Sequence, residues 1–224
     1  MEQGQNEYEN AEMPVSAKQI EYVFITHAHI DHTGMLPKLW KDGFRGKVYA
    51  TRATCNLCEI MLADSAHIQE SDAAYQTKKN ARKGLPAVEP AYTMEDVTEL
   101  LDNFRPCGYH EAIRVDDGLV VSFSDCGHLM GSAAVQLWLT EDGETRKVVF
   151  SGDVGNLDQP ILNDPQLISE ADYVIVESTY GDRYHDMERV WPVQELADCI
   201  QRALDAGGNL VIPSFAVGRT QEML

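Results

Sequence analysis

THAHIDHTG, residues Thr26–Gly34, places three histidines and one aspartate within six consecutive positions. The stretch follows Glu21–Ile25, an apolar segment that predicts a buried strand. Polar side chains at the end of a strand are the usual position for chemistry on an α/β sheet. Side chains two residues apart point the same way in an extended chain, so His27 and His29 can contact one ion. Imidazole and carboxylate ligands suit zinc, with manganese or iron as weaker alternatives.

Two more side chains of this stretch are candidates for a second ion. Asp31 keeps the parity of His27 and His29, whereas His32 is expected to project elsewhere as the backbone turns toward Gly34. A chain of this composition would contain such a pattern by accident on the order of once in a thousand. A metal site is therefore favoured over histidines that only support the fold.

Length and composition limit the other possibilities. A chain of 224 residues that is 44% hydrophobic can bury a substantial core. The net charge of −18 predicts a surface that repels polyanions, so a nucleic-acid role depends on a local site or on parts of a longer protein. We expect a cytoplasmic protein with no membrane partner, because neither a leader pattern nor an apolar run of about 20 residues is present.

The cysteines point to a reduced protein. Their number, five, is odd, which argues against a secreted disulfide framework. Cys55 and Cys58 have the spacing of a zinc-ribbon or redox pair, but no second pair follows. We therefore interpret both as small, partly buried helix residues.

Strands and helices alternate along the chain, which predicts an α/β fold with a mixed sheet and helices outside. The predicted strands are Glu21–Thr26, Lys47–Ala50, Leu119–Ser124, Ala134–Leu139, Lys147–Phe150, Tyr173–Val176 and Asn209–Ile212. The predicted helices are residues 53–83, Met94–Asn103 and Val193–Ala206.

Two later segments contain further candidate ligands. His128 follows a predicted strand and is flanked by glycines that allow backbone and metal to approach closely. Asp153 stands at the end of another predicted strand, inside a second glycine frame. Each segment alone is a weak signal, but together with His27 and His29 they predict a larger site, since two-metal hydrolysis needs a carboxylate between the ions.

The order HAHIDH, CGHLMGSA and FSGDVG resembles the metallo-β-lactamase fold. VESTYGDR (residues 176–183) and IPSFAVGRTQE (residues 212–222) resemble the β-CASP branch of that fold, which contains RNA-processing nucleases. The resemblance implies an incomplete αββα sandwich over residues 1–186 and the start of a truncated β-CASP α/β domain over residues 187–224. Family members carry strands before this segment and further histidines after it.

The same resemblance implies roles for individual residues. His27, His29 and His128 would hold one zinc, Asp31 and His32 a second, and Asp153 would bridge them. Asp31 would also orient the attacking water. Because the family's later histidines have no counterpart here, we expect one ion to be held firmly and the second weakly or not at all.

Two residues outside this ligand set are also given roles. Glu177 matches the acidic residue that supports a catalytic histidine in the family. Arg219 opens a predicted helix, where it could meet a phosphate or, with equal weight, form a salt bridge that holds the helix start.

The function that follows is a zinc-dependent phosphodiester hydrolase acting on RNA, of the endoribonuclease type. Two alternatives remain open: a metallo-hydrolase of small esters, thioesters or lactams, and a non-catalytic RNA-processing paralogue or fragment. RNA or DNA preference, endo or exo mode and assembly as a homodimer are also left open.

Overall fold

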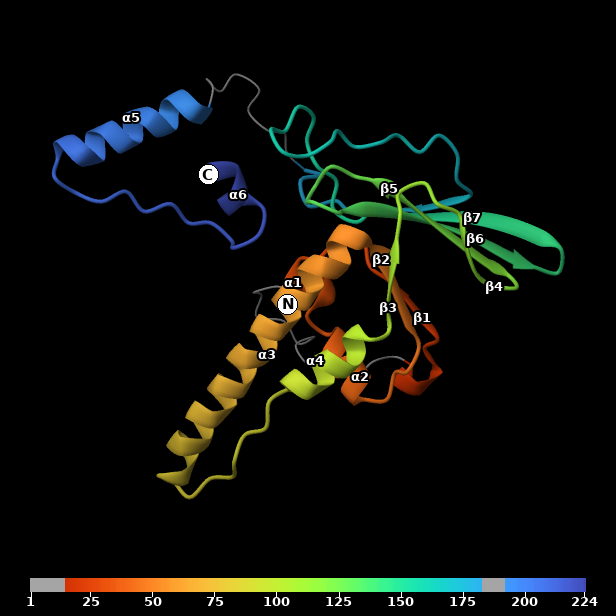
Figure 1. Cartoon of the computed structure of the whole chain (residues 1–224), viewed down its shortest axis with the longest axis horizontal. Helices are drawn as coiled ribbons and strands as arrows, with labels where there is room; N and C mark the ends of the chain where they lie inside the picture. Colours follow the sequence, from red (N-terminus) through yellow and green to blue (C-terminus); the bar gives the residue numbers. More distant parts are fainter. Residues whose placement is uncertain (1–14, 183–191) are drawn as a thin grey trace. The chain divides into compact units, whose positions relative to one another are not determined.

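The computed structural model describes residues 15–182 and 192–224, and the chain divides into two compact units, Met1–Glu177 and Ser178–Leu224 (Figure 1). The boundary predicted between residues 186 and 187 lies outside the described residues. Among the described helices, none is both long and apolar enough to cross a bilayer.

The first unit begins with a parallel three-stranded sheet in the order β1-β2-β3. Its strands are β1 (Tyr22–Phe24), β2 (Lys47–Thr51) and β3 (Phe104–Cys107). The short helix η1 (Ala17–Gln19) precedes β1, and the connections contain α1 (Ile30–Thr33), α2 (Leu36–Lys41), α3 (Arg52–Ala81) and α4 (Met94–Leu101). Helical crossovers are what parallel neighbours require, because a hairpin can join only antiparallel strands.

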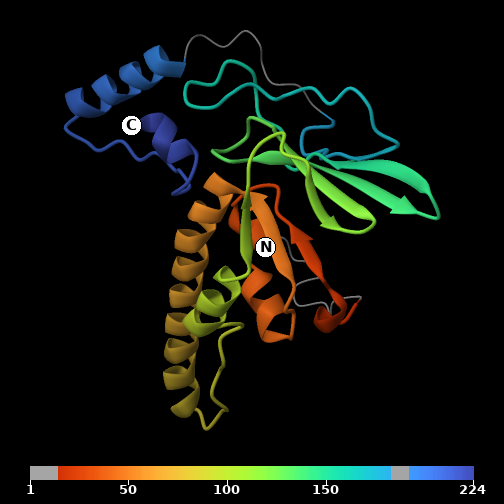
Figure 2. The ribbon, with the colours of Figure 1, turned by 45° about the vertical axis from the view of Figure 1, so that its right-hand side comes forward.

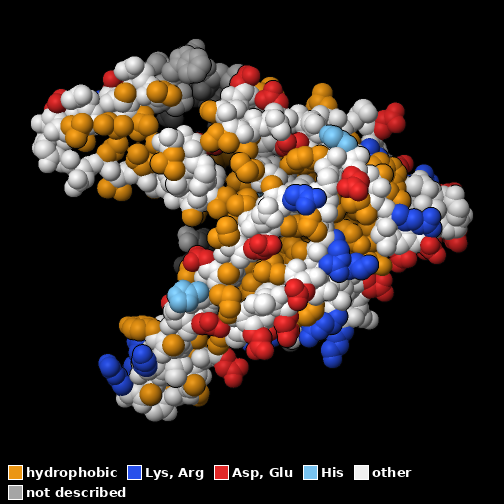
Figure 3. Space-filling view, in the orientation of Figure 1, with side chains coloured by type: hydrophobic (Ala, Val, Ile, Leu, Met, Phe, Trp, Pro, Cys, Tyr) orange, Lys and Arg blue, Asp and Glu red, His pale blue; other side chains and the backbone are white. Residues whose placement is uncertain are grey.

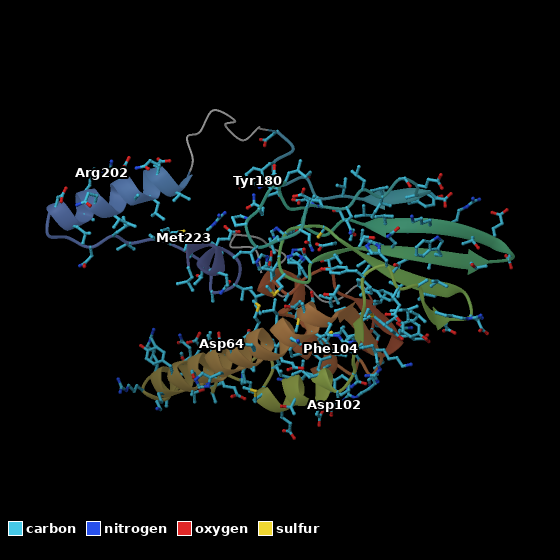
Figure 4. The ribbon with its side chains drawn as sticks, turned by 45° about the horizontal axis from the view of Figure 1, so that its top comes forward. Asp64, Asp102, Phe104, Tyr180, Arg202 and Met223 are labelled. Carbon is cyan, nitrogen blue, oxygen red and sulfur yellow. The ribbon has the colours of Figure 1, made fainter. Side chains whose placement is uncertain are left out.

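The helices of this unit pack against the three-stranded sheet and one another. α3 contacts β2 and β3, and α4 contacts both α3 and α2. The 30 residues of α3 span about 45 Å, and the helix runs past the ends of the strands (Figure 2). Asp102 and Phe104, labelled in Figure 4, mark the passage from α4 into β3.

A five-stranded sheet follows, with its strands in chain order. They are β4 (Ile113–Asp116), β5 (Leu119–Asp125), β6 (Ala133–Glu141), β7 (Glu144–Phe150) and β8 (Tyr173–Ile175). Pairing is antiparallel from β4 to β7, and β8 is parallel to β7. β6 and β7 meet at Asp142 (φ 51°) and Gly143 (φ 80°), the positive φ pair of a tight hairpin turn that the Asp-Gly sequence favours.

The two sheets share one apolar core. Tyr49 and Cys107 of the first sheet pack in one cluster with Val121, Phe123 and Val135 of the second. The backbone also joins them, since the amide of Ala133 donates to the carbonyl of Thr26 over 2.7 Å. Two packed sheets, with the described helices of this unit against the three-stranded one, agree with the α/β fold class predicted from the sequence.

The second unit contains α5 (Pro192–Asp205) and α6 (Arg219–Met223). α5 confirms the helix predicted from apolar spacing, and Arg202 in its last turn is labelled in Figure 4. Within this unit α5 leaves Val193, Ile200 and Leu204 exposed, and Figure 3 shows hydrophobic side chains gathered on it.

One predicted strand is wrong. Asn209–Ile212 forms no strand, and Val211 is 84% exposed. The described part of the second unit has no other strand, so the backbone of this segment has no neighbour with which to form a ladder. Conversely, β3, β4, α1 and α2 are absent from the prediction, because each is short and lacks the continuous apolar run that marks the equally short β1 and β8.

Candidate metal centre

Three loops bring the candidate ligands together, and the first ligand in each loop follows its strand at the same distance along the chain. His27, His128 and Asp153 lie three residues after the ends of β1, β5 and β7, respectively. β5 and β7 are both antiparallel to β6, so their carboxyl ends lie at the same end of the sheet. The hydrogen bond from Ala133 to Thr26 holds the loop after β1 beside them.

Four side chains converge there: His27, His29, His128 and Asp153. One ligand atom from each lies within 4.8 Å of the corresponding atoms of the other three. His128 Nε2 is 3.2 Å from His29 Nδ1 and 3.4 Å from Asp153 Oδ2, and His27 Nε2 is 3.7 Å from the same Oδ2. Three imidazoles and one carboxylate are a donor set of the kind that binds zinc with four ligands.

The state of His27 fits a metal ligand. Its side chain is fully buried, and Nε2 has no hydrogen-bond partner among the described residues. Burial, reinforced by His32, His128 and His29, lowers the pKa of His27 from 6.5 to about 2. The ring is therefore neutral at pH 7, which is the form that binds metals. A buried polar atom without a partner costs about 1–3 kcal/mol, and an ion at this position would satisfy it.

The pKa of His29 is lowered as well. Burial and the neighbouring His128 lower its pKa, although Asp31 and Asp153 oppose the shift. Neutral His27 and His29 can bind a cation without first releasing a proton. The four side chains together fit a divalent metal ion.

Asp31 and His32 lie beside this cluster, and the local backbone differs from the prediction. The extended chain ends at His29, which is the N-cap of α1, so Asp31 lies in a helical turn and does not continue the parity of His27 and His29. His32 Nε2 lies 3.6 Å from Asp31 Oδ2 and 3.4 Å from Asp153 Oδ1. Asp153 therefore directs Oδ2 toward His27 and His128 and Oδ1 toward His32.

Glycines allow the two ligand loops to approach closely. A Cβ at Gly155 would lie 1.7 Å from the carbonyl oxygen of Gly127. The loops are also bonded, since the Gly155 amide donates to the Cys126 carbonyl over 2.8 Å and Cys126 Sγ lies 3.1 Å from the Asp153 carbonyl oxygen. Gly155, one of the glycines that flank the ligands in the sequence, is therefore needed because a side chain there would keep the two loops apart.

Sequence reasoning missed two supporting side chains. Ser132 Oγ accepts the amides of both His128 and Leu129 over 3.0 Å, which holds the turn that carries His128. Cys126 donates its thiol to the carbonyl of Asp153. The position of Ser132, four residues after the candidate ligand His128 and inside the glycine-flanked turn, is the signal that could have identified it.

Glu177 and Arg219 occupy different units. Glu177 Oε1 accepts the amide of Val154 over 2.6 Å, so this carboxylate lies next to the backbone of Asp153. Arg219 opens α6 and forms an ion pair with Glu222. Of the two roles weighed for Arg219, this contact matches the salt bridge, and the phosphate role stays a prediction.

Comparison with known proteins gives a family model and several relatives. The model described as the metallo-beta-lactamase superfamily domain matches residues 2–179. A ribonuclease of Thermus thermophilus is 41% identical over 225 residues, and the match covers 100% of this chain and 47% of the relative. An RNase J-like protein of Methanocaldococcus jannaschii is 30% identical, over 96% of this chain and 45% of the relative.

A third relative is eukaryotic. The endoribonuclease YSH1 of Eremothecium gossypii is 29% identical, over 92% of this chain and 25% of the relative. The chain thus spans about half the length of the two prokaryotic relatives and a quarter of this one.

Proposed function

The chain belongs to the metallo-beta-lactamase superfamily, and from that premise we propose that the whole protein is a zinc-dependent hydrolase that cleaves RNA internally. The observation that carries the metal dependence is the four-ligand cluster around the fully buried, unpartnered Nε2 of His27. RNA as the substrate is supported by the relatives, whose names are ribonuclease, RNase J-like protein and endoribonuclease. The β-CASP-like segments at residues 176–183 and 212–222 support the same branch of the family.

His27, His29, His128 and Asp153 would hold the first ion. A divalent ion there supplies a Lewis acid that acidifies water and neutralises charge on a phosphate. Asp31, whose side chain is 48% exposed, is positioned beside His32 to accept a hydrogen bond from a water and so orient it. Glu177 would act indirectly, through the backbone next to Asp153.

A second ion would take Asp31, His32 and Oδ1 of Asp153. Asp31 and His32 have side chains 48% and 32% exposed, whereas His27 is fully buried. Fewer and more exposed ligands predict weaker binding, so we propose one firmly held and one weakly held zinc per chain. Elemental analysis of dialysed protein that found two tightly held ions per chain would contradict this stoichiometry.

The acidic surface predicts weak binding to RNA away from the metal site. With a net charge of −18, the chain repels phosphates on average. Affinity for RNA should therefore be low and should fall steeply with salt. A filter-binding titration that showed tight binding at physiological salt would be inconsistent with this expectation.

Cleavage of labelled single-stranded RNA, with DNA of the same sequence beside it, tests the proposal. Zinc-loaded protein should cut the RNA internally, and a chelator or Asp153→Asn should abolish cutting. Asp142→Asn is the matched control, because Asp142 lies in the exposed β6–β7 turn at a positive φ that asparagine accepts.

The outcomes separate the candidate functions. Chelator-insensitive cutting, or equal cutting by Asp153→Asn, would refute the metal-dependent nuclease. Turnover of a thioester or lactam without RNA cleavage would favour a small-molecule hydrolase. RNA binding without either activity would favour a non-catalytic paralogue.

A further inference from the structure

Thr26 lies against the ring nitrogen of His27 that faces away from the cluster. Its Oγ1 is 3.1 Å from His27 Nδ1. The other ring nitrogen, Nε2, is buried, lacks a hydrogen-bond partner among the described residues, and faces Asp153 Oδ2 at 3.7 Å. The two nitrogens of one ring therefore have different environments, one with a hydroxyl and one with the candidate ligands.

The difference matters because a neutral imidazole has one N–H and one lone pair. A metal takes the nitrogen with the lone pair, so the proton must reside on the other nitrogen. An acceptor at that second nitrogen fixes both the tautomer and the orientation of the ring.

We propose that Thr26 is a positioning residue: its hydroxyl oxygen accepts the Nδ1–H of His27 and thereby fixes the tautomer whose Nε2 lone pair points into the ligand cluster. The inference rests on the metal site of the proposed function. It adds a residue that contributes to zinc affinity without contacting zinc.

Thr26 is held from two sides, so its hydroxyl has a defined position. Its carbonyl accepts the amide of Ala133 over 2.7 Å, which ties it to the start of β6. On the side-chain face, a Cβ added at Gly152 would lie 2.7 Å from Thr26 Cβ and 3.0 Å from Oγ1. Gly152 precedes Asp153 and has a φ of +58°. Gly152, the neighbour of Asp153, therefore packs against Thr26, the neighbour of His27.

The hydroxyl can be removed with little change of shape. Thr26→Val replaces the oxygen by a methyl group, whereas Thr26→Ser keeps the oxygen. Thr54→Val is the control for loss of a buried threonine hydroxyl, because Thr54 is fully buried and donates to Gly131 O over 2.9 Å without touching a candidate ligand. Zinc affinity is measured by competition with a chromophoric chelator, and folding by circular dichroism.

We expect Thr26→Val to bind zinc about 10–100-fold more weakly than the wild type, which is the usual loss when the outer partner of a ligating histidine is removed. Thr26→Ser and Thr54→Val should bind within a few-fold of wild type. In the wild-type protein with zinc, ¹⁵N–¹H correlation spectra of the histidine rings should show His27 with its proton on Nδ1 and its zinc on Nε2.

Equal zinc affinity of Thr26→Val and wild type would overturn the inference, and so would a spectrum with zinc on Nδ1 or the proton on Nε2. The spectrum uses wild-type protein, so it decides the matter even if Thr26→Val does not fold. A wild type that binds no zinc would instead refute the proposed metal centre. The two failures are therefore distinguishable.

Discussion

Gly155→Ala tests whether close packing of the two ligand loops creates the metal centre. The added Cβ would lie 1.7 Å from Gly127 O and 2.1 Å from Gly127 C, both backbone atoms that cannot rotate aside. Ordinary contact begins near 3.4 Å, so the two loops must separate by about 1.7 Å. Metal–ligand distances vary by only about 0.2 Å, and Asp153 is two residues from the substituted position.

The expected result is a specific loss of metal binding. Asp153 should no longer reach the ion, and zinc affinity should fall by at least about 10–100-fold, the range found when a supporting partner alone is lost. Overpacking should also lower the free energy of unfolding by about 1–3 kcal/mol. Chelator competition measures the first quantity and urea unfolding of metal-free protein measures the second.

Gly208→Ala is the matched control for this substitution. A Cβ at Gly208 has its nearest neighbour, Ala203 O, at 3.7 Å, and the backbone there has no positive φ. This variant should bind zinc as the wild type does. If Gly155→Ala also bound zinc normally and unfolded at the wild-type urea concentration, the close approach of the two loops could not be the basis of the site.

Three further predictions concern acid, thiols and a helix cap. The pKa of His27 is lowered to about 2 in the folded chain, so below pH 6.5 the unfolded chain binds a proton on this ring that the folded chain does not. The free energy of unfolding of metal-free protein should therefore fall by up to about 1.4 kcal/mol per pH unit from 6.5 downward. Urea titrations that gave equal free energies of unfolding at pH 7.5 and 5 would contradict this. Of the five cysteines, only the half-buried Cys199 should react rapidly with a thiol reagent at pH 8. Burial raises the pKa of Cys55 and Cys58 to about 12 and that of Cys107 to about 11, and Cys126 is also buried. Labelling of more than one thiol per folded chain would contradict this prediction. Thr93→Ala removes the capping box with Asp96 and should cost about 1 kcal/mol in thermal unfolding while zinc affinity stays constant.

The sequence predicts the ligand cluster better than the backbone that carries it. His27, His29, His128 and Asp153 stand out because their residue types follow recognisable strands inside glycine-rich turns. The converging geometry could not be read from the chain, because it depends on which strand ends lie together in the sheets. The start of α1 at Ile30 was missed for a related reason: a helix of four residues has no periodicity of its own.

The second unit illustrates the opposite error. Asn209–Ile212 has the residues of a strand, but strand formation requires a neighbour, and the described part of that unit supplies none. Propensity describes what a segment accepts, whereas pairing depends on the rest of the fold. The helix α5 was predicted well because its hydrogen bonds are internal.

The arrangement of ligands on three loops has a consequence for biosynthesis. His27 and His29 leave the ribosome before His128 and Asp153, and Asp153 emerges only after β4 to β7 have been made. During that interval the nascent chain presents a two-histidine pair that discriminates poorly among transition metals, because affinity alone favours copper over zinc. Selection of a metal at this centre would therefore wait until β7 has joined the sheet and Asp153 has reached the histidines.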